Sequence, residues 1–229
     1  MSFSQLQQVT IGELIERHGG TITTGPFGTL LKASEYTEDG VPVISVGEIR
    51  QGYLLVQEHT PRVNGAVTKR LPQYLLREGD IVFGQKGAVE RSARVLACQA
   101  GWFLGSDGIS VRLPIQKCDT KFVSYLLQDA CHTQWITRHA LGSTMLSLNQ
   151  QIIRKIPLLL PPLPEQRKVA AILSTWDRAI ELTENQLERK GLRKQAVMQQ
   201  LFGGRVRLPE LADTKWIECR LGDVAQDIS

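Results

Sequence analysis

The chain has 229 residues, of which 42% are hydrophobic and 22% charged, and its formal net charge is +4. This composition excludes a disordered chain, and the length suits one sizeable domain with an extension or two small domains. No apolar stretch reaches the roughly 18 to 20 residues that span a bilayer, and the first residues lack the pattern of a secretory signal. We therefore expect a cytoplasmic protein with no membrane partner.

The first elements in the chain are indicated by local signals. Thr10 and Glu13 form a capping-box pattern that predicts a short helix over residues 11–18, and Gly19-Gly20 supplies its C-terminal stop. Residues 24–29 are too rich in glycine and proline for regular structure and predict an exposed loop. The β-branched residues 41–46 predict a buried strand.

The middle of the chain predicts strands and then helices. Gly79-Asp80 is a turn signal before a strand at residues 81–83, a glycine-rich loop at 84–87 and a second strand at 93–97. Residues 102–113 add strand-like sequence, and helical spacing of apolar residues predicts a helix over 121–139. Ser147 and Gln150 read as a capping pair for a helix at Ile152-Ile153, and residues 156–160 close the domain. We expect an α+β fold with a mixed sheet over residues 1–160.

A stiff segment, Pro161-Pro162-Leu163-Pro164, marks a boundary, and a helix is predicted from about residue 164 to 202, ended by Gly203-Gly204. Such a helix is about 58 Å long, whereas a domain of this size has a radius of gyration of about 15 Å. A helix that lies on its own domain is therefore the less favoured interpretation. We expect a Pro-rich junction and a long spacer helix over residues 161–204.

A heptad register along this helix gives ten seam positions, of which Thr183, Lys190 and Lys194 are the polar ones. The seven apolar positions form the expected helix-pairing seam of a coiled coil: Val169, Leu173, Trp176, Ile180, Leu187, Val197 and Leu201. Beyond the helix, residues 221–225 repeat the pattern of residues 11–15, namely apolar, glycine, acidic, apolar, apolar. Residues 205–229 are thus expected to be a linker and the start of a truncated second repeat.

The order of these features resembles the specificity subunit of Type I restriction-modification systems. The resemblance rests on Ser147-Leu148-Asn149-Gln150, on residues 156–157 and 160–166, and on the helix through Gly203-Gly204, with weaker landmarks at residues 28–32 and 79–82. It covers almost the whole chain, but as the N-terminal half of the usual subunit: one target-recognition domain and one conserved helical region.

The resemblance implies a non-catalytic subunit that recognises double-stranded DNA and directs methylation and cleavage by partner subunits. The partners are a modification (methyltransferase) subunit and a restriction (translocase and nuclease) subunit, which would carry the methyl donor and ATP. The missing second half leaves two alternatives, a truncation or a natural half-subunit. A half-subunit would pair with itself, as an antiparallel homodimer through the long helix, and read an inverted, interrupted repeat.

Catalytic motifs are not found in the sequence. It has no glycine-rich methyl-donor loop with an Asn/Asp-Pro-Pro-aromatic motif and no phosphate-binding loop for ATP, and Asp80 lacks the second carboxylate of a metal-dependent nuclease. The four histidines and four scattered cysteines have no metal-ligand spacing, and we expect the cysteines to be reduced and structural. The adjacent pair Cys131 and His132 points apart on a helix. We expect no cofactor, no metal and no catalysis.

Candidate DNA-binding residues come from the two glycine-rich loops, from a local surplus of basic residues between Arg62 and Arg94, and from Gly142-Ser143-Thr144, which offers hydroxyls and amides to phosphate. These candidates are Thr29, Lys32, Lys69, Arg70, Gln85, Lys86, Arg91, Arg94, Ser143 and Thr144. For each of them, an ordinary turn or surface charge is the alternative interpretation. For the whole chain, the main alternative is a coiled-coil assembly adaptor that does not bind DNA; a stand-alone nuclease or methyltransferase conflicts with the missing motifs.

Overall fold

The computed structural model describes residues 7–142, 145–214, 216–220 and 222. The chain divides into two compact units, of which the first ends at Ser174 and the second begins at Thr175. The described strands and helices α1 to α5 belong to the first unit, and the long helix α6 (Leu163–Phe202) starts in the first unit and continues in the second. The expected α+β fold with a mixed sheet and a long C-terminal helix is therefore confirmed.

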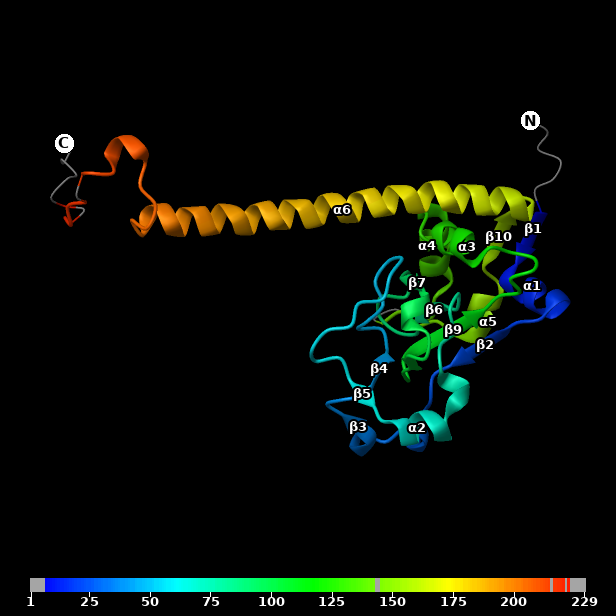
Figure 1. Ribbon diagram of the computed structural model, residues 1–229. Helices are drawn as coiled ribbons and strands as arrows, with labels where there is room; N and C mark the ends of the chain where they lie inside the picture. The colour runs from blue at the N-terminus through cyan, green and yellow to red at the C-terminus, as the bar shows by residue number, and fades with distance from the viewer. Residues whose placement is uncertain (1–6, 143–144, 215, 221, 223–229) are drawn as a thin grey trace. The chain divides into compact units, whose positions relative to one another are not determined.

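The described strands of the first unit, which Figure 1 draws as arrows, form three sheets according to their hydrogen-bonded pairing. One has two antiparallel strands, β1 and β10; the second has the antiparallel order β2-β9-β6-β7; the third has the order β3-β5-β4-β8, in which β4 and β8 are parallel. The strand bounds are β1 Gln7–Thr10, β2 Thr21–Thr24, β3 Tyr36–Thr37, β4 Val41–Ile44, β5 Arg62–Val63, β6 Ile81–Gly84, β7 Ser92–Arg94, β8 Phe103–Leu104, β9 Gly108–Arg112 and β10 Pro157–Leu160.

The helices of the first unit are short. They are α1 Ile11–His18, α2 Gly65–Arg70, α3 Thr120–Leu126, α4 Ala130–His139 and α5 Gln150–Arg154, with 3-10 turns η2 Gly28–Leu30, η3 Ala33–Glu35, η4 Pro72–Tyr74 and η5 Ala97–Gln99. A further 3-10 turn, η6 Pro209–Leu211, lies in the second unit.

Strand β6 is buried on both faces. Because successive side chains of a strand point to opposite faces, Ile81 and Phe83 pack into the largest apolar cluster, with Ile109 and Val111 of β9, while Val82 packs into a second cluster. All three β6 side chains are fully buried. A strand covered on both sides needs a continuous apolar run, which explains why Ile81-Val82-Phe83 does not alternate with polar residues.

The predicted helix at residues 11–18 is confirmed as α1. Thr10 Oγ1 accepts a hydrogen bond from the Glu13 amide at 3.2 Å, and the Glu13 carboxylate accepts one from the Thr10 amide at 2.8 Å, which completes the capping box. Both contacts join residues three apart in sequence, so the signal is local and readable without the fold.

Two predictions about the later helices are wrong. The helix predicted over residues 121–139 is two helices, because Asp129 leaves the helical conformation and its Oδ1 accepts from the His132 amide at 2.8 Å to cap α4. The cap of α5 is Asn149, whose Oδ1 accepts from the Ile152 amide at 2.9 Å. Ser147 instead pairs through its backbone with Leu141.

The first turns of α6 pack within the first unit, where Gln166 makes the side-chain hydrogen bonds. Gln166 is 1% exposed; its Oε1 accepts from the Asp119 amide at 2.9 Å, and its Nε2 donates to the Pro161 carbonyl at 2.8 Å. Ala170, one turn later, is also buried in the core. The helix has 40 residues, or about 60 Å at 1.5 Å per residue, and thus confirms the predicted long helix. Among the described residues, no helix is long and apolar enough to cross a membrane.

Candidate nucleic-acid interface

Strand register brings three loops to one end of the β2-β9-β6-β7 sheet. Thr24, the last residue of β2, lies opposite Ile109, and Gly84, the last residue of β6, lies opposite Gly108. The loops that follow β2 (residues 25–28) and β6 (residues 84–91) therefore leave the sheet beside the turn that precedes β9 (residues 105–107). The two glycine-rich loops predicted as DNA-binding segments lie together.

Backbone contacts hold these loops against one another. The Gly25 amide donates to the Gly108 carbonyl at 2.9 Å, and the Gln85 amide donates to the Asp107 carbonyl at 2.8 Å. A side chain at Gly25 would place its Cβ 1.8 Å from the Gly105 carbonyl oxygen, so the close approach of the two backbones requires glycine there. Gly25 thus has a packing role that composition alone did not identify.

A fourth segment, residues 141–151, joins the same end of the sheet. The Gly87 amide donates to the Leu146 carbonyl at 2.9 Å, and the Leu148 amide donates to the Gln85 carbonyl at 2.7 Å. Gln150 Nε2 donates to Thr24 Oγ1 at 3.0 Å. We define the four-loop cluster as residues 25–28, 84–91, 105–107 and 145–151. Ser143 and Thr144, which the sequence predicted as DNA contacts, lie outside the described residues.

The basic side chains of the four-loop cluster are held loosely. Lys86 Nζ lies 3.7 Å from Asp107 Oδ1, and Arg91 Nε lies 3.8 Å from Glu90 Oε1; both cationic side chains are more than 40% exposed. Exposed pairs of this kind contribute at most about 1 kcal/mol, so either cation can exchange its carboxylate for a phosphate at little cost. Tyr36 lies near enough to this turn to be affected by the Asp107 carboxylate. Partial burial, followed by that negative charge, raises the pKa of the Tyr36 phenol and favours its neutral form.

Four other candidates form a second group around η2 and α2. Thr29 lies in η2 and is exposed, and the exposed Lys32 and Lys69 make no ion pair among the described residues. Arg70 donates to the Leu30 carbonyl at 3.1 Å and pairs with Glu35. A hydrogen bond from the Lys32 amide, together with the Arg70 guanidinium, lowers the pKa of Glu35 and keeps this carboxylate charged.

Arg94 is not brought together with the other candidates. It lies opposite Ile81, at the other end of β6 from Gly84. Its Nε donates to Thr120 Oγ1 at 3.2 Å, its Nη2 lies 3.6 Å from Glu78 Oε1, and its side chain is 18% exposed. These contacts support a structural role that joins β7 to α3.

Asp80 is held in a structural ion pair. Arg112 Nε and Nη2 donate to its two carboxylate oxygens at 2.8 and 2.7 Å, and the Arg77 amide donates to Oδ2 at 2.8 Å. Among the described residues, no group of three histidine, cysteine or acidic side chains could hold a metal ion.

The cysteines are free thiols, and Cys118 alone among them is buried. Burial, followed by the nearby Asp119 carboxylate, raises the pKa of the Cys118 thiol to about 12 and keeps it protonated. Cys98, Cys131 and Cys219 are exposed, so the expected structural role fits Cys118 but not these three. The His132 ring, next to Cys131, instead contacts Asp129 Oδ2 at 2.9 Å and the Pro157 carbonyl at 3.0 Å.

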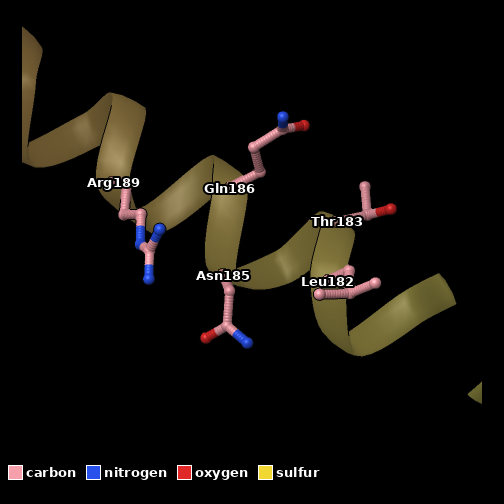
Figure 2. A pocket seen from close by; sticks show the side chains of 5 residues that line it. All are labelled: Leu182, Thr183, Asn185, Gln186 and Arg189. Carbon is pink, nitrogen blue, oxygen red and sulfur yellow. The ribbon is translucent and has the colours of Figure 1, made fainter. Parts of the chain in front are cut away.

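The predicted helix-pairing residues lie on α6 with large exposed areas. Trp176 is 66% exposed, Ile180 55% and Leu187 72%, while Leu173 and Val197 are 38% and 43% exposed. Val169 and Leu201 are partly buried, and Val169 packs against the core of the first unit. A shallow hollow of about 400 Å³ farther along is formed by α6 side chains alone, among them Thr183, Asn185 and Arg189 (Figure 2). Because no second element closes this hollow, it has no enclosed ligand site.

Sequence reasoning missed four side chains at the four-loop cluster: Phe27, Asn149, Gln150 and Gln151. They line a hollow of about 410 Å³ together with Thr24 and Gln85. Asn149 and Gln150 had served as family landmarks, without an expected place in the site. Their position depends on contacts between residues more than 120 positions apart in sequence, such as the hydrogen bond from Gln150 to Thr24. The residues next to them in sequence do not predict such contacts.

The comparisons with known proteins agree with this architecture. The family model for the Type I restriction modification DNA specificity domain matches residues 4–189. The Type I restriction enzyme MjaVIII specificity subunit of Methanocaldococcus jannaschii is 23% identical over 197 residues, which cover 80% of this chain and 44% of that relative. The putative MjaX specificity subunit of the same organism is 28% identical over 138 residues, or 58% of this chain and 32% of the relative.

Solved structures show the same fold. The S subunit of a Type I restriction-modification system from M. genitalium matches with a TM-score of 0.59 and 17% identity, over 87% of this chain and 46% of that one. The HsdS subunit from Thermoanaerobacter tengcongensis matches with a TM-score of 0.56 and 18% identity, over 87% and 45%. This chain spans less than half the length of each of these relatives. Because the family model covers most of the chain, the protein belongs to the Type I restriction modification DNA specificity domain family.

Proposed function

We propose that this chain recognises a specific sequence in double-stranded DNA as the specificity subunit, or half-subunit, of a Type I restriction-modification complex. The observation that carries the proposal is the four-loop cluster: in a chain of this family, it presents exposed Lys86 and Arg91 beside an amide-lined hollow. Basic side chains position a protein on the phosphates, and amides read base edges in a groove. A cytoplasmic location accords with this role.

In this proposal the chain binds the DNA target, and its partner subunits catalyse the reactions. A modification subunit would transfer the methyl group, and a restriction subunit would hydrolyse ATP and cleave DNA. We expect the purified chain alone to show no methyl transfer, no ATP hydrolysis and no DNA cleavage, as measured with labelled methyl donor, phosphate release and plasmid nicking. Reproducible turnover by a homogeneous sample would contradict this role.

Residues 1–160 act as the target-recognition domain in this proposal, residues 161–204 as the junction and spacer helix, and residues 205–229 as the linker to a second repeat. As a half-subunit, the chain would form an antiparallel homodimer through α6. The exposed apolar seam from Trp176 to Leu187 supports this pairing, because large apolar side chains rarely remain uncovered along one helix face.

The proposed function is tested by co-purification and DNA binding. The full chain is tagged, the modification subunit from the same operon is co-expressed, and binding to duplexes of random sequence is followed by selection and sequencing. Recovery of the modification subunit together with an enriched duplex motif would support the proposal. Assembly with no duplex binding would instead favour the coiled-coil adaptor.

Two basic side chains of the four-loop cluster give a sharper test. Lys86→Ala or Arg91→Ala is expected to weaken binding to all duplexes equally and to reduce the slope of log K against log salt by about one for each phosphate that the variant no longer neutralises. Lys117→Ala is the matched control, because Lys117 follows β9 at the opposite end of the sheet. Binding isotherms at several salt concentrations measure the slope. A slope that the two variants leave unchanged would remove both residues from the interface.

A further inference from the structure

The hollow in the four-loop cluster is lined by an unusual set of side chains. Four amides (Gln85, Asn149, Gln150 and Gln151) share about 410 Å³ with Thr24 and with Phe27, whose side chain is 51% exposed. Within the described part of the chain, the residues that line the hollow are all uncharged. A surface that only attracted phosphate would be lined by lysine and arginine, whereas amides have paired donors and acceptors that match base edges.

One of these amides has an unmet acceptor. Among the residues that the structure describes, Oε1 of Gln85 is buried and accepts no hydrogen bond. A buried polar atom without a partner costs free energy, and a hydrogen-bond donor that reaches it would recover that cost. The ligand group that satisfies it must be a hydrogen-bond donor.

Neighbouring amides are already occupied in part. Asn149 Oδ1 caps α5 by accepting from the Ile152 amide, and Gln150 Nε2 donates to Thr24 Oγ1. These contacts fix the walls of the hollow and leave Gln85 as the amide whose buried acceptor still needs a donor. Gln85 is itself placed firmly, because its backbone bonds to Asp107 on one side and to Leu148 on the other.

Resting on the proposed function, we infer that this hollow reads one A·T base pair in the major groove, with Gln85 as the specificity-determining residue. An adenine offers an N6–H donor and an N7 acceptor side by side, and a glutamine amide matches both at once. The paired thymine carries a C5-methyl group, for which the Phe27 ring is a suitable apolar contact. Lys86, the next residue, holds the adjacent phosphate.

The experiment selects duplexes from a randomised library with the full chain in complex with the co-expressed modification subunit, and compares wild type with Gln85→Ala and Gln85→Glu. Gln73→Ala, an exposed amide in η4, is the matched control. Wild type and Gln73→Ala are expected to enrich the same motif. Gln85→Ala should lose the preference for adenine at one position by roughly 5- to 150-fold and keep the other positions, and Gln85→Glu should shift that position towards cytosine, whose N4–H donates to a carboxylate.

A second measurement uses modified bases. Wild-type binding is measured on its selected duplex with 7-deazaadenine at the assigned position, which removes N7, and with deoxyuridine in place of the paired thymine, which removes the methyl group. Both replacements should weaken binding by wild type. The 7-deazaadenine replacement should not weaken binding by Gln85→Ala, and the deoxyuridine replacement should not weaken binding by Phe27→Ala.

The outcomes separate this inference from the proposed function. If wild type binds no duplex, the proposed function fails and the inference fails with it. If wild type selects a motif that Gln85→Ala also selects, or if the variant loses affinity equally for every duplex, the inference alone is overturned. Insensitivity of wild type to 7-deazaadenine at every adenine of its motif overturns it as well.

Discussion

If the chain pairs through α6 as proposed, the double substitution Leu173→Asp with Ile180→Asp is expected to convert the dimer into a monomer and to abolish binding to the modification subunit. Both residues lie at one seam position of α6, seven residues apart, and are 38% and 55% exposed in the single chain. Pairing would bury them, and an aspartate without a partner in an apolar seam costs several kcal/mol, which exceeds the free energy of a marginal helical pair. Light scattering and co-purification measure the two losses.

The control for this experiment is Asn185→Asp with Gln199→Asp, which adds the same charge at the heptad position opposite the seam. These residues are exposed on α6, and the Asn185 side chain is drawn in Figure 2. The control pair should leave the mass unchanged, and thermal unfolding of the first unit should be alike in both variants. If wild type is monomeric, and the seam variant still binds its partner while the first unit unfolds, then α6 serves as core and the spacer role is wrong.

Asp80→Ala is expected to destabilise the first unit by about 3–5 kcal/mol, the cost of breaking a buried ion pair by removing one partner. The Asp80 side chain is 2% exposed and receives three hydrogen bonds, from the Arg112 guanidinium and the Arg77 amide, all of which would be left without an acceptor. Arg112 is 34% exposed, so solvent relieves part of its loss and the lower end of this range is the better expectation.

Urea titration measures the change in the free energy of unfolding. Glu78→Ala is the matched control, because its carboxylate is 57% exposed and lies 3.6 Å from Arg94; this variant should lose at most about 1 kcal/mol. Equal stability of the Asp80 variant and wild type would show that the pair with Arg112 contributes nothing to folding.

The sequence was most informative where the physical signal is local. The capping box at Thr10 and the long helix after Pro162 are set by neighbours a few residues apart, and both were predicted within a residue or two. The break between α3 and α4 was missed because the apolar residues keep a helical spacing across it. Asp129, which lies among them, leaves the helical conformation and caps the start of α4. Strand β1 was missed because Gln7–Thr10 has little apolar content of its own and is ordered by pairing with β10.

The candidate site shows the same division. Glycine content identified the loops at residues 24–29 and 84–87, and composition identified Lys86 and Gln85 as candidates. The grouping of these loops depends on strand register, on the Gly25–Gly105 approach and on the contact between Gln150 and Thr24, which join residues far apart in the chain. The same long-range packing removes Arg94 from the group, although it lies near Arg91 in sequence.

The burial of β6 on both faces has an evolutionary consequence. Its apolar residues, and Val89 within the loop at residues 84–91, lie in the largest apolar cluster or in the second one, while Lys86 and Gly87 at the tip of that loop are exposed. Substitutions at the tip therefore carry a small folding penalty, because loops carried on a rigid scaffold tolerate change. If the four-loop cluster reads DNA as proposed, new target preferences can arise by replacing a few tip residues while the buried apolar residues of β6 stay unchanged.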